Sequence, residues 1–187
     1  RDLTGDWSSD VCSSDLWQGF LDIIVISNKW MEAIIMEEKI VSFEGFKAVG
    51  IPYFGNNSNG EIATLWESFN KNRGSIKQKS KSMLCYGICD YGDCGMNSEG
   101  RFHYTACSEV DSFSDVPEGM VTKVVPEGKY MMYTYSGAIK DLGAFYNDVF
   151  TKLIPASGYE FDCRPLLELY DDRFMNNGEF DICVPIK

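Results

Sequence analysis

A single carboxylate lies in the middle of an apolar run near the C-terminus, within Pro165–Asp171. The alternation of this run predicts a β-strand in which Leu166, Glu168 and Tyr170 share one face. A charge on an apolar face costs free energy unless it is paired, hydrogen-bonded or facing a cleft. Glu168 is therefore a candidate binding residue. The alternatives are an edge-strand glutamate in water or an ion pair with Arg164, which the alternation places on the same face.

Aromatic side chains on other predicted elements are candidate walls for a ligand at this carboxylate. Each contact between an organic cation and an aromatic face contributes about 0.5 to 2 kcal/mol. Trp66 lies on the apolar face of a predicted helix, where core packing is the simpler role. Tyr170 shares the face of Glu168 and either contacts the ligand or supports the carboxylate. The remaining candidates lie on predicted strands: Tyr86, Tyr104 and Tyr133.

Other catalytic and metal-binding patterns are weaker. The cysteine spacing in Cys85–Cys94 is not that of a zinc knuckle and lacks a fourth ligand, so we expect no metal site. His103 is the only histidine, and no nucleophile elbow accompanies it. A hydrolase remains an alternative, with Glu168 or Glu109 as base and a tyrosine hydroxyl polarising the leaving group. The sequence leaves open whether the protein is an enzyme, and we expect no cofactor.

The chain has 187 residues, a formal net charge of -11 and a pI near 4.5. The electrostatic field of this negative charge repels phosphate backbones and anionic membranes. We therefore expect a small hydrophobic or cationic ligand, with neither nucleic acid nor membrane as a direct partner. A protein partner is compatible with the composition. Cysteines within apolar strands are expected to be free thiols in a reduced, cytoplasmic environment. They are Cys85, Cys107, Cys163 and Cys183.

The N-terminal part of the chain does not fit a folded domain. Residues 1–16 have no helical or strand period and resemble, residue for residue, the translation of a common sequencing adapter. We interpret residues 1–37 as an artefact or non-native leader and place one domain at residues 38–187. The apolar stretch at residues 17–30 is too short to span a bilayer and lacks a preceding basic region. An extra strand is the alternative interpretation of that stretch.

The elements that must position Glu168 follow the same order twice. The first half predicts a strand at Ile40–Phe54 with bends at Gly45 and Gly50, a helix from Ile62, and strands at Met83–Cys89 and Phe102–Val110. The second half predicts a strand at Met120–Tyr135 broken at Pro126–Gly128, a helix at Ala138–Leu153, and strands at Arg164–Tyr170 and Phe180–Ile186. The offset of roughly 75 to 80 residues suggests two copies of one unit. The expected fold is α+β, with two strand-helix-strand-strand repeats, pseudo-two-fold symmetry and a central ligand groove.

Over residues 38–187 the chain resembles the GyrI-like small-molecule-binding domain, also called the AraC effector-binding domain. The motifs that carry the resemblance, in order, are Phe43–Pro52, Ala63–Trp66, Val125–Tyr130, Gly137, Leu153–Tyr159, Leu167–Tyr170 and Asp181–Ile186. The resemblance implies a groove between the halves, lined by aromatic residues, with the strand glutamate Glu168 at its base. It also implies binding of cationic or amphipathic organic molecules. Without a helix-turn-helix pattern before Glu38, we expect a stand-alone member.

Three functions follow from this resemblance. The first is binding of small amphipathic, aromatic or cationic molecules for sensing or sequestration, because binding requires only the carboxylate and aromatic walls. The second is hydrolysis of strained electrophilic molecules, as in family members that act on cyclopropanoid compounds. The third is inhibition through a protein interaction, as in the gyrase-inhibiting member.

The domain boundary leads to a first prediction. Deleting residues 1–30 should leave the free energy of unfolding unchanged, because no core residue is assigned there. Denaturant melting of the full and shortened chains measures this difference. A loss of more than about 2 kcal/mol, beyond ordinary surface effects, would show that residues 23–26 form a real strand.

Overall fold

The computed structural model describes residues 35–90 and 100–187. The strands are β1 (Ile35–Phe43), β2 (Phe46–Gly55), β3 (Cys85–Asp90), β4 (Phe102–Val110), β5 (Val121–Val125), β6 (Gly128–Ser136), β7 (Leu166–Tyr170) and β8 (Glu179–Pro185). The helices are α3 (Glu61–Asn72), α4 (Leu142–Asp148), α5 (Ile154–Ser157) and α6 (Asp172–Asn177). A π-helical segment, Val149–Leu153, joins α4 to α5. Almost all of the expected leader lies outside the described residues.

The strands form one antiparallel sheet in the order β1-β6-β8-β7-β3-β4-β2-β5. The first repeat is β2-α3-β3-β4, and the second is β6-α4-β7-β8. In each repeat the strand after the helix lies at the centre of the sheet, so β3 and β7 are direct neighbours. This arrangement confirms the predicted α+β fold with two repeats and pseudo-two-fold symmetry.

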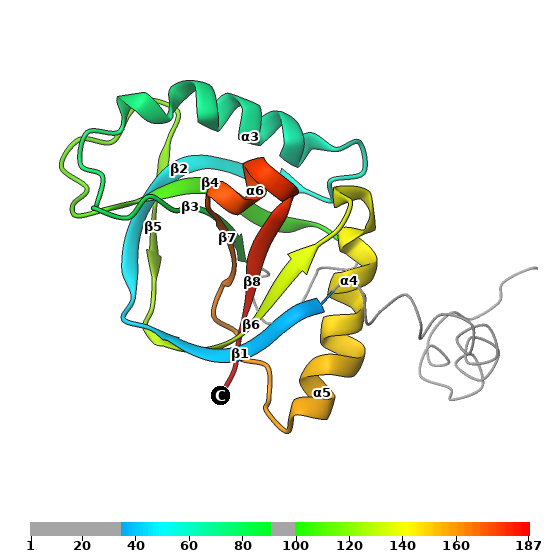
Figure 1. Cartoon of the computed structure of the whole chain (residues 1–187). Helices are drawn as coiled ribbons and strands as arrows, with labels where there is room; N and C mark the ends of the chain where they lie inside the picture. The colour runs from blue at the N-terminus through cyan, green and yellow to red at the C-terminus, as the bar shows by residue number, and fades with distance from the viewer. Residues whose placement is uncertain (1–34, 91–99) are drawn as a thin grey trace, which may run out of the picture. The chain divides into compact units, whose positions relative to one another are not determined.

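The connections between strands force the sheet to curl. Only Glu44 and Gly45 separate β1 from β2, although these strands lie near opposite ends of the sheet. The same holds for β5 and β6, which are joined at Pro126 and Glu127. Gly45 has a φ of 70°, which favours glycine, so the predicted bend there is confirmed. Figure 1 shows the strands wrapping around a common centre, with α3, α4 and α5 outside the curve.

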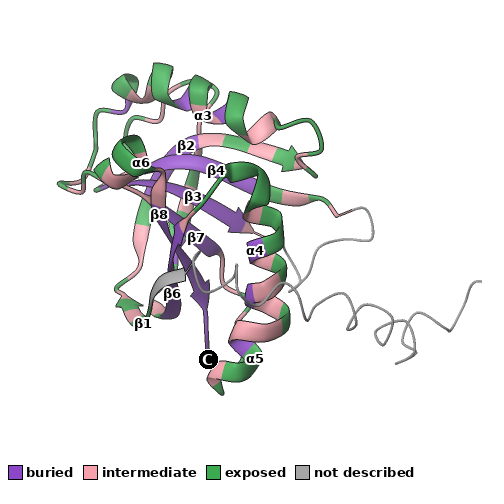
Figure 2. Cartoon of the chain, turned by 45° about the vertical axis from the view of Figure 1, so that its right-hand side comes forward, coloured by how far each residue is buried: buried purple, intermediate pink, exposed green. Residues whose placement is uncertain are grey.

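The curl separates two buried faces of the sheet. The inner face holds an apolar cluster formed by Ala48, Tyr86, Ile88, Cys107, Val125, Tyr130, Met132, Leu167, Leu169 and Cys183. The outer face is covered by the helices, which contribute Leu65, Phe69 and Phe145 to the core. Figure 2 shows the central strands mostly buried and the outward sides of α3 and α4 exposed. Glu168 therefore lies between sheet and helices, rather than inside the curl.

Two sequence expectations need correction. Cys163 is disulfide-bonded rather than free, and it is exposed in the segment before β7, outside the strands that bury the other expected thiols. Cys85, Cys107 and Cys183 are free and buried, as expected.

The short helix α6 follows β7 directly and was not predicted. Its start is capped by the Asp171 carboxylate, which accepts a hydrogen bond from the Arg173 backbone N–H at 2.8 Å.

None of the helices in the described part of the chain is long and apolar enough to cross a membrane. The described residues also contain no group of three or more histidine, cysteine, aspartate or glutamate side chains placed to hold a metal ion. Cys94, the last cysteine of the spacing considered for zinc, lies outside those residues.

Arg164 holds the second bend of the sheet to the C-terminal segment. Its guanidinium donates hydrogen bonds to the backbone carbonyls of Glu127 at 3.1 Å, Lys129 at 2.9 Å and Ile186 at 2.9 Å. It also forms an ion pair with Asp162 at 2.6 Å. The alternative in which Arg164 pairs with the β7 glutamate is therefore wrong.

Replacing this guanidinium should destabilise the fold. Arg164→Leu leaves three backbone carbonyls without their charged donor, so the free energy of unfolding should fall by about 2 to 4 kcal/mol. Urea unfolding measures the change. The control is Lys187→Leu, which removes an exposed ion pair with Glu160 and should cost less than about 1 kcal/mol. Equal losses in the two variants would contradict the bracing role of Arg164.

Candidate functional site

Glu168 lies at the centre of the sheet on β7. Its neighbours in register are Gly87 on β3 and Ile182 on β8. Only 4% of the residue is exposed. The interpretation of Glu168 as an edge-strand glutamate in water is therefore wrong, and its charge must be compensated within the protein or by a ligand.

Three tyrosine hydroxyls donate hydrogen bonds to the carboxylate. Tyr104 and Tyr170 donate to Oε2, at 2.5 Å and 3.0 Å, and Tyr146 donates to Oε1 at 2.5 Å. Tyr104 and Tyr170 come from strands β4 and β7, whereas Tyr146 comes from α4. Of the residues that the structure describes, no lysine, arginine or histidine forms an ion pair with Glu168. The carboxylate is thus hydrogen-bonded, but its charge is not neutralised by a basic side chain of the described part.

Trp66 joins this cluster from α3. Its indole N–H donates a hydrogen bond to the Tyr104 hydroxyl at 2.9 Å, which fixes the direction in which that hydroxyl donates. The indole ring also packs edge-on against Tyr170, with ring centroids 4.7 Å apart. Trp66 is half-buried, so it both supports the cluster and forms part of its outer boundary.

Gly87 makes room for the cluster. A Cβ atom at this position would meet the Tyr104 hydroxyl and, at 2.6 Å, Oε2 of Glu168. Gly87 is the register neighbour of Glu168 in the other repeat. At this pair of register neighbours, β7 carries a glutamate and β3 carries a glycine, which has no side chain.

The unpredicted helix α6 holds Tyr170 in place. The Phe174 ring packs against Tyr170 at 5.0 Å, and Phe180 stacks on it at 4.7 Å. Arg173 fastens α6 to β8 through an ion pair with Asp181 at 2.6 Å. These contacts fix the phenol of Tyr170 beneath the helix layer.

Burial controls the ionisation of the cluster. It raises the pKa of Glu168, and the three hydroxyl donors oppose this shift only in part. Because the folded pKa is raised, the stability contributed by the protonated form is complete below the unfolded pKa and is lost as the pH rises through the folded pKa. Burial and the nearby carboxylate also raise the pKa of Tyr104 and Tyr170 well above the ordinary tyrosine value, so both remain neutral donors.

The other two predicted tyrosines occupy different places. Tyr133 lies on the face of Glu168, two strands away through Ile182. Tyr86 lies on the inner face, where its hydroxyl donates to Glu109 at 3.4 Å. The structure therefore brings neither Tyr86 nor Glu109 to the carboxylate of Glu168.

Tyr146 belongs to the site, although we did not select it from the sequence. It lies on the apolar stripe of the second helix, at the helical spacing of Leu142, Phe145 and Val149. A tyrosine in such a stripe has a polar tip that needs a partner when buried, which is the signal that would have selected it.

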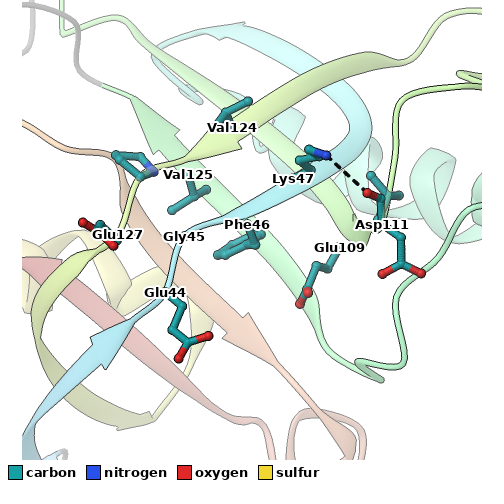
Figure 3. A pocket seen from close by; sticks show the side chains of 11 residues that line it. Glu44, Gly45, Phe46, Lys47, Glu109, Asp111, Val124, Val125 and Glu127 are labelled. Atoms are coloured by element: carbon teal, nitrogen blue, oxygen red, sulfur yellow. Dashed lines mark hydrogen bonds between the residues drawn. The ribbon is translucent and has the colours of Figure 1, made fainter.

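A hollow of about 500 Å³ lies elsewhere, at the mouth of the inner face. Its lining comprises Glu44, Gly45, Phe46, Lys47, Glu109, Val110, Asp111, Val124, Val125, Pro126 and Glu127. Figure 3 shows Phe46 and Val125 between the carboxylates of Glu44, Glu109 and Glu127. Glu168 does not line this hollow. At Glu168 the expected central groove is filled by the aromatic cluster.

Comparison with known proteins places this geometry in a family. The family model of Cass2, an integron-associated effector binding protein, matches residues 39–186. The transcriptional regulator BrlR of Pseudomonas aeruginosa is 33% identical over 155 residues, covering 81% of this chain and 56% of BrlR. The chain thus spans about half the length of this curated relative.

Solved structures share the fold at lower identity. An integron cassette protein from Vibrio cholerae has a TM-score of 0.57 and 18% identity, covering 82% of this chain and 98% of its own. The protein SAV2435, solved bound to tetraphenylphosphonium, has a TM-score of 0.63 and 18% identity, covering 81% and 94%. At these identities the similarity concerns the fold.

The space left by Gly87 can be tested directly. Gly87→Ala should push the Tyr104 hydroxyl away from Glu168 and lower the free energy of unfolding by about 1 to 3 kcal/mol. The control is Gly143→Ala on α4, where a Cβ meets open space and the change should be neutral or stabilising by up to about 1 kcal/mol. Thermal melting measures both. Gly87→Ala with unchanged stability would show that the cluster tolerates a methyl group and is not tightly constrained.

Proposed function

The chain belongs to the family of integron-associated effector-binding proteins, and on this premise we propose that it binds small organic cations at Glu168. The observation that carries the proposal is the buried carboxylate itself. It is held by three hydroxyl donors and by no basic side chain of the described residues. An ionised carboxylate in such a place gains more from an added cation than one exposed to water, because the surrounding dielectric is low.

The surroundings of Glu168 suit a cation with an apolar body. Trp66 and Tyr170 are partly buried and offer aromatic rings beside the carboxylate, with one face of Tyr170 covered by Phe180. Ring faces attract organic cations, and more strongly when water is excluded. A lipophilic cation therefore matches both the charge of the carboxylate and the apolar character of its surroundings.

The comparisons support this class of ligand. SAV2435, which shares the fold, was solved with tetraphenylphosphonium, a lipophilic organic cation. BrlR is a transcriptional regulator, so sensing of a ligand is one role that a binding domain serves. We propose sensing or sequestration of toxic organic cations for this chain. The net charge of -11 of these 187 residues disfavours direct contact of this domain with nucleic-acid phosphates.

Ligand binding requires fewer changes in the hydrogen bonds of the cluster than hydrolysis does. A hydrolase would use Glu168 as a base and a tyrosine hydroxyl to polarise a leaving group. Each of the three tyrosines in contact with Glu168 directs its hydroxyl proton to that carboxylate instead. Hydrolysis would require at least one of these bonds to be exchanged for a bond to the substrate, so binding is the function we propose.

Removing the charge of Glu168 tests the proposal. Glu168→Gln keeps the shape of the side chain, and the affinity for tetraphenylphosphonium should fall at least about tenfold because a charge-charge contact is lost. Isothermal titration calorimetry measures the dissociation constants. Thermal melting establishes that the variant is folded.

The matched control is Glu109→Gln, which removes the carboxylate partner of Tyr86 on the inner face. Its affinity should equal that of the wild type. If Glu168→Gln binds as tightly as the wild type, the assignment of Glu168 is wrong. If Glu109→Gln alone weakens binding, the ligand occupies the hollow on the inner face instead.

A further inference from the structure

The hydroxyl group of Tyr133 is buried and makes no hydrogen bond within the described structure. The residue has 0% exposure, and its hydroxyl has no hydrogen-bond partner among the described residues. Buried hydroxyls are normally paired, because leaving a donor or acceptor unsatisfied is costly. Burial raises the pKa of Tyr133 above its ordinary value, so the hydroxyl keeps its proton. A donor is thus available at this position.

Tyr133 and Glu168 are contacted by two adjacent residues of α4. They share one face of the sheet, in a row in which Ile182 is the register partner of both. The Phe145 ring of α4 packs edge-on against Tyr133 at 6.2 Å, and the next residue, Tyr146, donates to Glu168. Adjacent residues of one helix therefore contact the Tyr133 ring and the Glu168 carboxylate.

The helix that contacts both residues is interrupted by an irregular turn. α4 continues directly into the π-helical segment Val149–Leu153 and then into α5. π-helical turns inside helices often accompany functional sites.

We propose that the Tyr133 hydroxyl donates a hydrogen bond to an acceptor oxygen on the cation bound at Glu168. This inference rests on the proposed function and narrows its ligand class to organic cations that carry an ester, ketone or ether oxygen. Two strand spacings separate the two residues by about 10 Å. At this backbone separation, one small organic cation with an acceptor oxygen near its charged group can reach both side chains.

A matched pair of cations tests the inference. Benzoylcholine carries an ester between its phenyl ring and its trimethylammonium group, and trimethyl(4-phenylbutyl)ammonium replaces that ester with two methylene groups. The wild type should bind benzoylcholine about three- to tenfold more tightly, the range of one net hydrogen bond. Tyr133→Phe keeps the ring and should abolish this preference, with the affinity for the alkyl cation unchanged. Titration calorimetry measures all the affinities.

Tyr130→Phe is the matched control variant. The Tyr130 hydroxyl is also buried without a partner, but it lies in the apolar cluster of the inner face. This variant should retain the wild-type preference for the ester. A preference that persists in Tyr133→Phe, or that disappears in Tyr130→Phe alone, overturns the inference.

The same titrations separate this inference from the proposed function. If both cations bind, lose affinity in Glu168→Gln and are not distinguished by the wild type, the inference is wrong and the proposed function stands. If neither cation binds to the wild type, both are wrong. If the ester preference is present and depends on Tyr133, the hydroxyl is a contact of the ligand.

Discussion

The constraint on which this site depends is that the carboxyl group of Glu168, buried at the centre of the sheet, must be hydrogen-bonded there by hydroxyl groups. A carboxylate in this place without donors would cost several kcal/mol. Three phenols offset part of that cost, and each is held by a different part of the fold. Tyr104 is fixed by the Trp66 indole, Tyr170 by the rings of α6 and β8, and Tyr146 by its position on α4. The helices on the outer face are therefore parts of the site as well as covers of the core.

The curl of the sheet allows this arrangement. It gathers an apolar cluster on the inner face and leaves the outer face of β3 and β7 to the site. The pseudo-two-fold symmetry brings those two strands together at the centre of the sheet. Because the repeats differ in sequence, Glu168 faces Gly87 rather than a second acid, so two like charges are not buried side by side. The repeated unit forms the scaffold, and the sequence difference between the repeats accounts for the candidate site.

The sequence was sufficient for features that depend on local pattern. The alternation around Glu168 predicted a carboxylate on an apolar face, and glycine and proline predicted the bends at Gly45 and Pro126. The sequence could not predict features that depend on strand register, because alternation along one strand does not reveal which face of the neighbouring strand lies on the same side of the sheet. Tyr86 was therefore grouped with Glu168, although it lies on the opposite face, and the space at Gly87 was missed. Tyr146 was not selected from the sequence, because its helical spacing is the same whether it packs in the core or reaches Glu168.

The central claim is that the ionised form of Glu168 binds the ligand, and the pH dependence of tetraphenylphosphonium binding tests it most directly. The cation stabilises the carboxylate and opposes the raised pKa of the free protein. The neighbouring Tyr104, Tyr170 and Cys89 have pKa values raised well above their ordinary ones, so Glu168 is expected to dominate titration near the site. The account predicts that affinity rises with pH until the pH exceeds the raised pKa of Glu168 in the free protein and then levels off, with proton release on binding below that pKa. Constant affinity without proton release would contradict it.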